Sequence, residues 1–328
     1  MSMIGVRIAA VWLALAVLCL SPPAHAYGLR VGPLYLPLPF AGGYHQHRRP
    51  DSEAPPAKLA QNGAPELIFA VLAWPSFIDD VFRPTNFSAW PFSYQSIFDQ
   101  AFAKYPPERT ADLCPRRIAV GDIALRIGRQ VALTAAQRPL LQKLGGALAQ
   151  AEGYLIKSCP SQIPPQPIDR LQLMETQIDT VTMALEIVRP PLQKFEQSLN
   201  DKQRTAFAAR TMAASTVDRD AAPTCAAKLE PANWPLPVLE QTVQPTPAQQ
   251  EAVAKLQRAL ARAASDLAAD CPDGVPRMPS ARLQAIESRL DTTWDAVQTI
   301  QVGLAQFRSQ LNDQQSARFN DLEIAAAR

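Results

Sequence analysis

A long internal repeat constrains this chain more than any other feature of its sequence. Residues 134–208 align without a gap to residues 246–320, at an offset of 112 positions, and 28 of the 75 aligned pairs are identical. The identities include a Cys-Pro step at Cys159 and Cys271. The chain is therefore built around one structural unit used twice, and both copies are expected to adopt the same fold.

Each copy carries two stretches in which apolar residues recur at intervals of three and four, a spacing that places their side chains on one face of an α-helix. The shorter stretch is Leu141, Leu144, Leu148, Ala151 and Leu155, repeated as Val253, Leu256, Leu260, Ala263 and Leu267. The longer stretch is Leu171, Met174, Ile178, Val181, Leu185, Val188, Leu192, Phe195 and Leu199, repeated as Leu283, Ile286, Leu290, Thr293, Val297, Ile300, Leu304, Phe307 and Leu311. We therefore predict two helical hairpins with apolar cores, whose second helices run about 30 residues, or roughly 45 Å. Pro190-Pro191 is expected to kink or break the second helix of the first copy.

Four short elements of the form Leu-Thr/Asn-x-x-Gln stand where helices are expected to begin. They are Leu133, Thr134 and Gln137; Leu199, Asn200 and Gln203; Thr246 and Gln249, which follow Pro245; and Leu311, Asn312 and Gln315. In a capping box the Thr or Asn side chain accepts from the backbone amide three residues on, while the Gln side chain reaches back to the cap amide. Helix capping alone explains these residues.

Four such elements in one chain resemble the LTxxQ-motif family, which includes the periplasmic chaperone Spy and the stress protein CpxP. The similarity covers about residues 114–325, and it departs from the motif at Pro245 and at the two asparagines. The resemblance implies a Spy-like, ATP-independent chaperone that binds unfolded or partly folded periplasmic clients. Two alternatives stay open: a CpxP-like adaptor or regulator of an envelope stress sensor, and a structural envelope protein.

The first 26 residues are typical of a cleaved signal peptide. An apolar stretch of about 13 residues follows Arg7 and ends in a small-x-small cleavage pattern, Ala24-His25-Ala26, and it is too short to span a bilayer. The sequence therefore predicts an exported, periplasmic protein without an integral membrane span.

We predict an all-α fold of two homologous helical-hairpin units, residues 114–210 and 225–326, behind a disordered Pro-rich arm, residues 27–65. Residues 66–113 hold 11 of the 23 aromatic residues, including Trp74, Phe77, Phe82, Trp90, Phe92, Tyr94, Phe98 and Phe102. They are interpreted as core that covers the hairpins, in preference to an adhesive surface, because exposed aromatic patches are costly for solubility.

Export places the cysteines in an oxidising compartment, where an even number favours disulfides. Once Cys19 leaves with the signal peptide, four remain: Cys114, Cys159, Cys225 and Cys271. Three pairings are possible. The repeat favours Cys114–Cys159 and Cys225–Cys271, since the members of each pair are 45 and 46 residues apart.

The composition argues against enzymes and nucleic-acid binders. The net charge is only +2, which is too small for a nucleic-acid footprint. All three histidines precede position 48, and no Gly-rich phosphate loop is present, so no catalytic, cofactor or metal site is predicted. A metal role for His45 and His47 is the weaker interpretation, because two histidines in a flexible segment are a poor ligand set.

Two repeated acidic pairs lie beside the long apolar stretch: Glu175 with Asp179, and Glu287 with Asp291. Without an accompanying histidine they lack the pattern of helical-bundle metal sites. They are interpreted as solvated helix flanks, salt-bridged to nearby arginines.

Overall fold

The computed structural model describes residues 74, 78, 81–82, 94–103, 122–212, 235–270 and 276–322. Within these ranges the regular structure is helical and contains no strand, which confirms the all-α prediction. The expected signal peptide, residues 1–26, and the arm, residues 27–65, lie outside the described residues.

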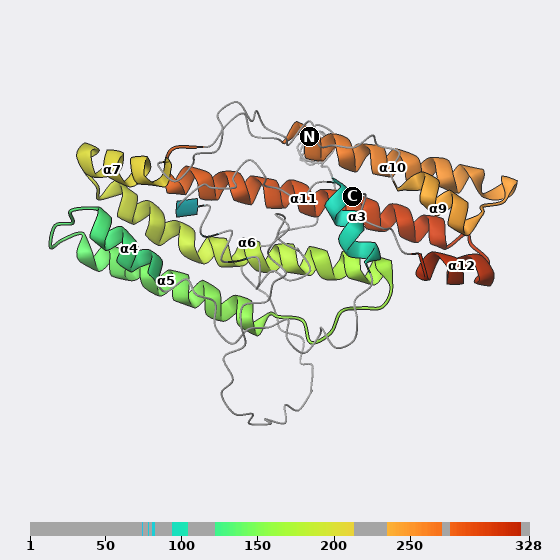
Figure 1. Cartoon of the computed structure of the whole chain (residues 1–328), viewed down its shortest axis with the longest axis horizontal. Coiled ribbons are helices and arrows are strands. Elements are labelled where there is room, and N and C mark those ends of the chain that lie inside the picture. Colours follow the sequence, from blue (N-terminus) through green and yellow to red (C-terminus); the bar gives the residue numbers. More distant parts are fainter. Residues whose placement is uncertain are drawn as a thin grey trace, which may run out of the picture. The chain divides into compact units, whose positions relative to one another are not determined.

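The two copies fold into the same series of helices (Figure 1). The first contains α4 (Asp122–Gln130), α5 (Arg138–Lys157), α6 (Pro167–Gln197) and α7 (Asp201–Met212). The second contains α9 (Leu236–Val243), the 3₁₀ turn η5 (Pro247–Gln249), α10 (Gln250–Ala269), α11 (Pro279–Arg308) and α12 (Asp313–Asn320). The long helices α6 and α11 have 31 and 30 residues, as the apolar spacing predicts.

Each hairpin packs its short helix against its long one, and the two long helices pack against each other. The most extensive contacts join α5 to α6, α6 to α11 and α11 to α10. The direction of α6 relative to α11 follows from two contacts, Arg189 with Glu287 and Glu196 with Ser280, in which a higher number on α6 meets a lower number on α11. The two long helices therefore run antiparallel, and each copy presents the same helix to the other.

The apolar stretches form the core, as their spacing predicts. All of these side chains are buried, apart from Leu311, which is partly buried and packs against the others. Each stretch thus faces inward along its full length, and the core is continuous from one hairpin to the other.

The expected break at Pro190-Pro191 does not occur, and α6 continues through both prolines to Gln197. Proline removes a backbone donor and costs a helix interior about 3 kcal/mol. The neighbouring side chains of Val188 and Leu192 are fully buried on the core side. Packing on both sides of the prolines holds this stretch helical.

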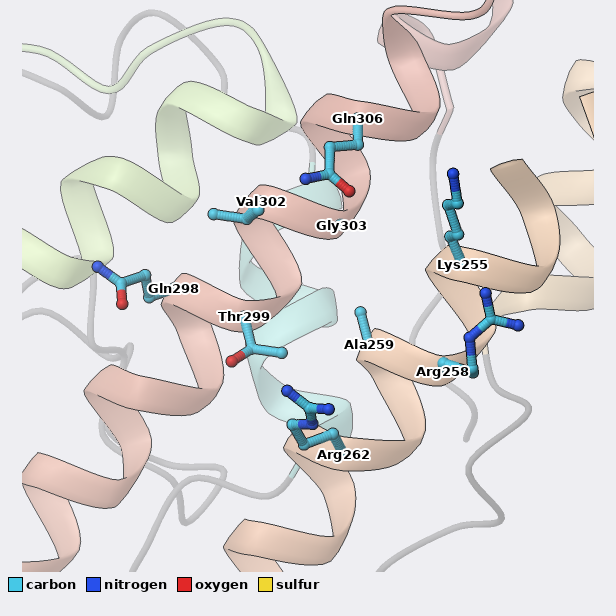
Figure 2. Close-up of a pocket in the computed structure, with 9 residues that line it drawn as sticks. All are labelled: Lys255, Arg258, Ala259, Arg262, Gln298, Thr299, Val302, Gly303 and Gln306. Carbon is cyan, nitrogen blue, oxygen red and sulfur yellow. The ribbon is translucent and has the colours of Figure 1, made fainter. Parts of the chain in front are cut away.

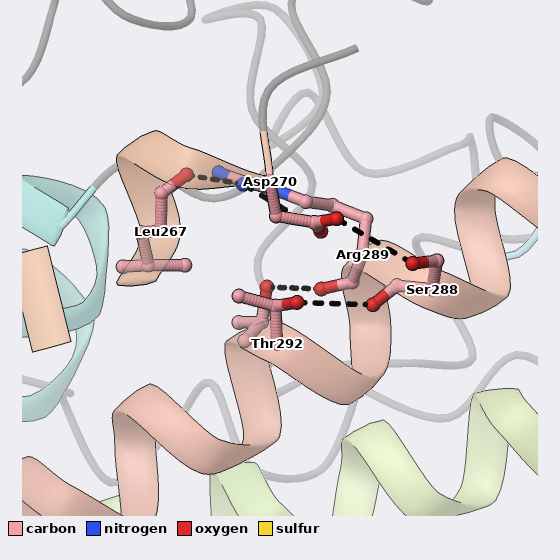
Figure 3. Close-up of polar contacts among 6 residues, drawn as sticks. Leu267, Asp270, Ser288, Arg289 and Thr292 are labelled. Carbon is pink, nitrogen blue, oxygen red and sulfur yellow. Dashed lines mark hydrogen bonds and ion pairs between the residues drawn. The ribbon is translucent and has the colours of Figure 1, made fainter. Parts of the chain in front are cut away.

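The C-terminal end of α10 is tied to α11 by Arg289 (Figure 3). Its Nη1 donates to the backbone carbonyl of Leu267 and lies 3.8 Å from the carboxylate of Asp270. Burial lowers the pKa of Arg289 to about 10, while Asp270 opposes that shift. An arginine that hydrogen-bonds the last carbonyls of a helix satisfies acceptors that lack a partner within the helix. In the first copy the equivalent residue is the buried Gln177.

The described part of the aromatic segment lies in the core. The helix α3 (Tyr94–Phe102) contacts α6, and the rings of Phe98 and Phe102 are buried, as are those of Trp74 and Phe82. Phe77, Trp90, Phe92 and the side chain of Tyr94 lie outside the described residues.

Candidate functional site: paired motifs and the groove between α10 and α11

In the first hairpin the two motif glutamines form a reciprocal pair. Nε2 of Gln137 donates to Oε1 of Gln203 at 2.9 Å, and Nε2 of Gln203 donates to Oε1 of Gln137 at the same distance. Both side chains are buried, with 7% of their surface exposed. The two motifs, which begin different helices, are therefore fastened to each other.

Each glutamine amide in this pair uses its full hydrogen-bonding capacity. The second N–H of Gln137 goes to the carbonyl of Ser198 at 2.6 Å, and that of Gln203 goes to the carbonyl of Ala132 at 2.7 Å. Each Oε1 also accepts from the backbone amide at the start of its own motif, Thr134 or Asn200. A primary amide has two donors and two acceptor positions, and all four are filled in both side chains.

The second hairpin repeats this arrangement. Gln249 and Gln315 exchange hydrogen bonds of 2.9 and 3.0 Å, and their remaining donors reach the carbonyls of Gln310 and Gln244. Gln315 is buried, whereas Gln249 is only partly buried. The same reciprocal glutamine pair therefore joins the two motifs of both hairpins, and it is more exposed to solvent in the second.

The asparagine and threonine motifs begin their helices differently. The side chains of Asn200 and Asn312 accept from the backbone amides of Gln203 and Gln315, each at 2.9 Å. At the threonine motifs, the backbone amide of the glutamine donates to the threonine carbonyl, at 3.2 Å from Gln137 and 2.9 Å from Gln249. The threonine motifs thus form a tight turn first, and α5 and α10 begin after it.

The leading apolar positions of the motifs pack inward. Leu199 is buried, while Leu133 and Leu311 are partly buried against the core. Cys159, in the loop between α5 and α6, is disulfide-bonded. Cys114, Cys225 and Cys271 lie outside the described residues, as do His45 and His47.

The acidic flanks are less solvated than the sequence analysis expects. Glu287 is only 8% exposed and its Oε2 accepts from Nη1 of Arg189 at 3.2 Å. Glu175 is partly buried, and its Oε1 has no hydrogen-bond partner among the described residues. Desolvation raises the pKa of both carboxyls to about 7, and Asp179 adds to the shift at Glu175. The solvated part of that interpretation is therefore wrong for Glu287, because α6 packs against α11 beside it, whereas the expected salt bridge to an arginine is present.

We expect Glu175→Gln to stabilise the protein at pH 8 and to have little effect at pH 4. The carboxyl titrates near 7 in the fold against a reference value of 4.5, so the folded state keeps a proton that the unfolded chain loses between these values. Stability then falls as the pH rises through this window, and the amide removes the penalty. Because the group is partly exposed, solvent screening limits the gain to about 1 kcal/mol.

Urea unfolding at the two pH values measures this difference. Glu287→Gln is the matched control, since it relieves the same desolvation but weakens the contact with Arg189, and it should gain less. An effect of Glu175→Gln that is equal at pH 4 and pH 8 contradicts the assignment.

A groove of about 430 Å³ lies between α10 and α11 (Figure 2). Lys255, Arg258 and Arg262 line it from α10, and none of the described residues that line it carries a carboxylate. Val302 on α11 is 48% exposed in the same groove. The groove therefore combines positive charge with an exposed apolar side chain.

Two of the three groove cations belong to the second hairpin alone, whereas Lys255 aligns with Lys143 of the first. At the positions of Arg258 and Arg262 the first copy has Gly146 and Gln150. The sequence analysis missed the groove, although the signal was available in the aligned copies, where two neutral residues of one copy are arginines in the other.

The fold and the paired motifs together define a class of protein: an all-helical chain of two homologous hairpins, each closed by reciprocal glutamines. A family model described as LTXXQ motif family protein matches residues 124–211 and 231–323, one match for each hairpin. The chain belongs to the LTXXQ motif family. No curated protein and no solved structure matches it. Among the helices that the structure describes, none is long and apolar enough to cross a bilayer.

Proposed function

We propose that this protein is an ATP-independent periplasmic chaperone that holds unfolded or partly folded clients, in the manner of Spy. Family membership is the observation that carries the proposal. The export signal expected in residues 1–26 supports a compartment without ATP, which suits a holding activity that needs no nucleotide.

The groove between α10 and α11 is the client surface in this proposal. Unfolded chains expose apolar side chains and acidic residues together, and the groove is lined by Val302 from α11 and by Arg258 and Arg262 from α10. Contacts of both kinds are weak one at a time and salt-dependent in part, so a client is held reversibly.

The test is aggregation of a chemically unfolded client, without ATP, in the presence of equimolar residues 27–328. We expect suppression by the wild-type protein and clearly weaker suppression by Arg258→Gln/Arg262→Gln. The matched control is Arg138→Gln/Lys143→Gln, which removes the same charge from exposed positions of α5 and should leave suppression unchanged.

Absence of suppression at several-fold excess overturns the chaperone proposal. Retention of a single envelope sensor protein in a pull-down would then favour the CpxP-like adaptor. An equal loss of suppression in both double variants would show that the protein is a chaperone whose client surface is not this groove.

A further inference from the structure

The aromatic segment contains a short repeat of its own. Residues 74–82, Trp-Pro-Ser-Phe-Ile-Asp-Asp-Val-Phe, align at an offset of 20 with residues 94–102, Tyr-Gln-Ser-Ile-Phe-Asp-Gln-Ala-Phe. Both begin with an aromatic residue, share Ser, Asp and Phe at positions three, six and nine, and carry apolar residues at positions four, five and eight. Ile78, Val81 and Phe82 are helical and buried, as are their counterparts Phe98, Ala101 and Phe102.

Equivalent arginines of the two hairpins bind equivalent carbonyls of these two segments. Nη1 of Arg170 donates to the carbonyls of Ala101 at 2.9 Å and Ala103 at 2.6 Å, at the C-terminal end of α3. Nε of Arg282 donates to the carbonyl of Val81 at 2.6 Å. Val81 aligns with Ala101, so each arginine engages its segment at the same position of the short repeat.

The two arginines are also held in the same way. Arg170 donates to the carbonyls of Pro164 and Pro165, and Arg282 donates to those of Pro276 and Arg277, which are the equivalent positions of the loop before each long helix. The side chain of Arg282 is fully buried. The guanidinium forks are therefore fixed by the hairpin before any segment binds them.

The terminal phenylalanine of each segment contacts the hairpin that does not supply the arginine. The ring of Phe82 lies 6.5 Å from that of Phe207 in α7, and the ring of Phe102 lies 6.0 Å from that of Phe319 in α12. Phe207 and Phe319 are equivalent positions of the repeat. Each segment is therefore bound by an arginine from one hairpin and a phenylalanine from the other, and we call these two sites sockets.

We propose that these two sockets are recognition sites for a short aromatic segment that ends in Phe, and that the chain fills them with its own segments 74–82 and 94–102 as intramolecular ligands. The specificity comes from the carbonyl that precedes the terminal Phe, which accepts from the arginine, and from the Phe itself. Because each site is built from both hairpins, a bound segment holds the two hairpins together. This inference rests on the contacts alone and does not depend on the proposed function.

Hydrogen exchange on residues 27–328 tests the assignment of each segment to its socket. Arg170→Lys keeps the charge but loses the planar fork, so it should reduce amide protection in residues 94–103 at least tenfold and leave 81–82 protected. Arg282→Lys should do the reverse. If either variant loses amide protection in both segments, or in neither, the assignment is overturned.

A binding experiment tests recognition directly. Phe82→Ser/Phe102→Ser in residues 27–328 weakens the resident ligands, and a fluorescein-labelled peptide of residues 92–104 is the probe in an anisotropy titration. We expect this variant to bind the peptide at least tenfold more tightly than the wild type, and the addition of Arg170→Lys/Arg282→Lys to abolish that gain. The proposal is overturned if the peptide binds equally well with and without the arginine substitutions. It is also overturned if the phenylalanine variant has the circular dichroism of the wild type and does not bind the peptide. If the phenylalanine variant does not fold, the exchange experiment decides alone.

Discussion

Replacing Gln203 with leucine is expected to lower the free energy of unfolding by about 3 to 5 kcal/mol, because it leaves several buried polar groups without partners at a cost of about 1–3 kcal/mol each. The amide of Gln203 donates to Ala132 and Gln137 and accepts from Gln137 and Asn200. Leucine has a similar volume, so the loss is one of hydrogen bonding and leaves packing largely intact. Urea unfolding monitored by circular dichroism measures it.

Two comparisons identify the cause of this loss. Gln249→Leu removes one amide of the equivalent pair in the second hairpin, at the position that corresponds to Gln137, where the side chain is partly exposed and water can replace the lost partners, so it should cost about half as much. Gln137→Leu/Gln203→Leu should cost clearly less than the sum of the two single variants, since the second substitution removes groups that the first has orphaned. Strict additivity would show that the two amides do not depend on each other.

Gly303→Val is expected to cost about 3 kcal/mol, the upper range for overpacking of a well-packed interface. A Cβ at this position would lie 3.0 Å from Cβ of Ala259 and 3.3 Å from Cδ1 of Leu256, so α10 has to move away from α11 to admit a branched side chain (Figure 2). Thermal or urea unfolding reports the change.

Gly153→Ala provides the opposite control. This glycine lies in the interior of α5, and a Cβ there would meet nothing within 4 Å. The substitution should therefore stabilise the protein by about 0.5–1 kcal/mol through helix propensity alone. If both substitutions destabilise to the same degree, close approach of α10 and α11 is not what requires Gly303.

Local patterns predict the hairpins well, because a helix buries one face and the 3-4 spacing of its apolar residues records that face. The same reasoning could not predict the reciprocal glutamine pairs. Gln137 and Gln203 are 66 residues apart, and a capping box describes only the four residues around each one. The recurrence of that separation at Gln249 and Gln315 was the available signal.

Other features could not be predicted from the sequence, for different physical reasons. Helices α3, α4 and α9 have only eight or nine residues, and helices this short are stabilised mainly by packing of their apolar faces on the core. The burial of Glu287 depends on which helix covers it, which spacing within one helix does not reveal. Arg170 and Arg282 are identical in the two copies, but the carbonyls of Ala101 and Val81 that they also bind belong to segments outside the repeat.

The antiparallel contact of α6 with α11 joins two copies that share one polypeptide. In a pair of separate subunits such a contact would be lost on dilution, whereas here the linker holds the two halves at a high effective concentration. Their association is thus a first-order process that does not depend on how much protein is present. A single chain also lets the two halves differ in sequence, as they do at Arg258 and Arg262, which align with Gly146 and Gln150.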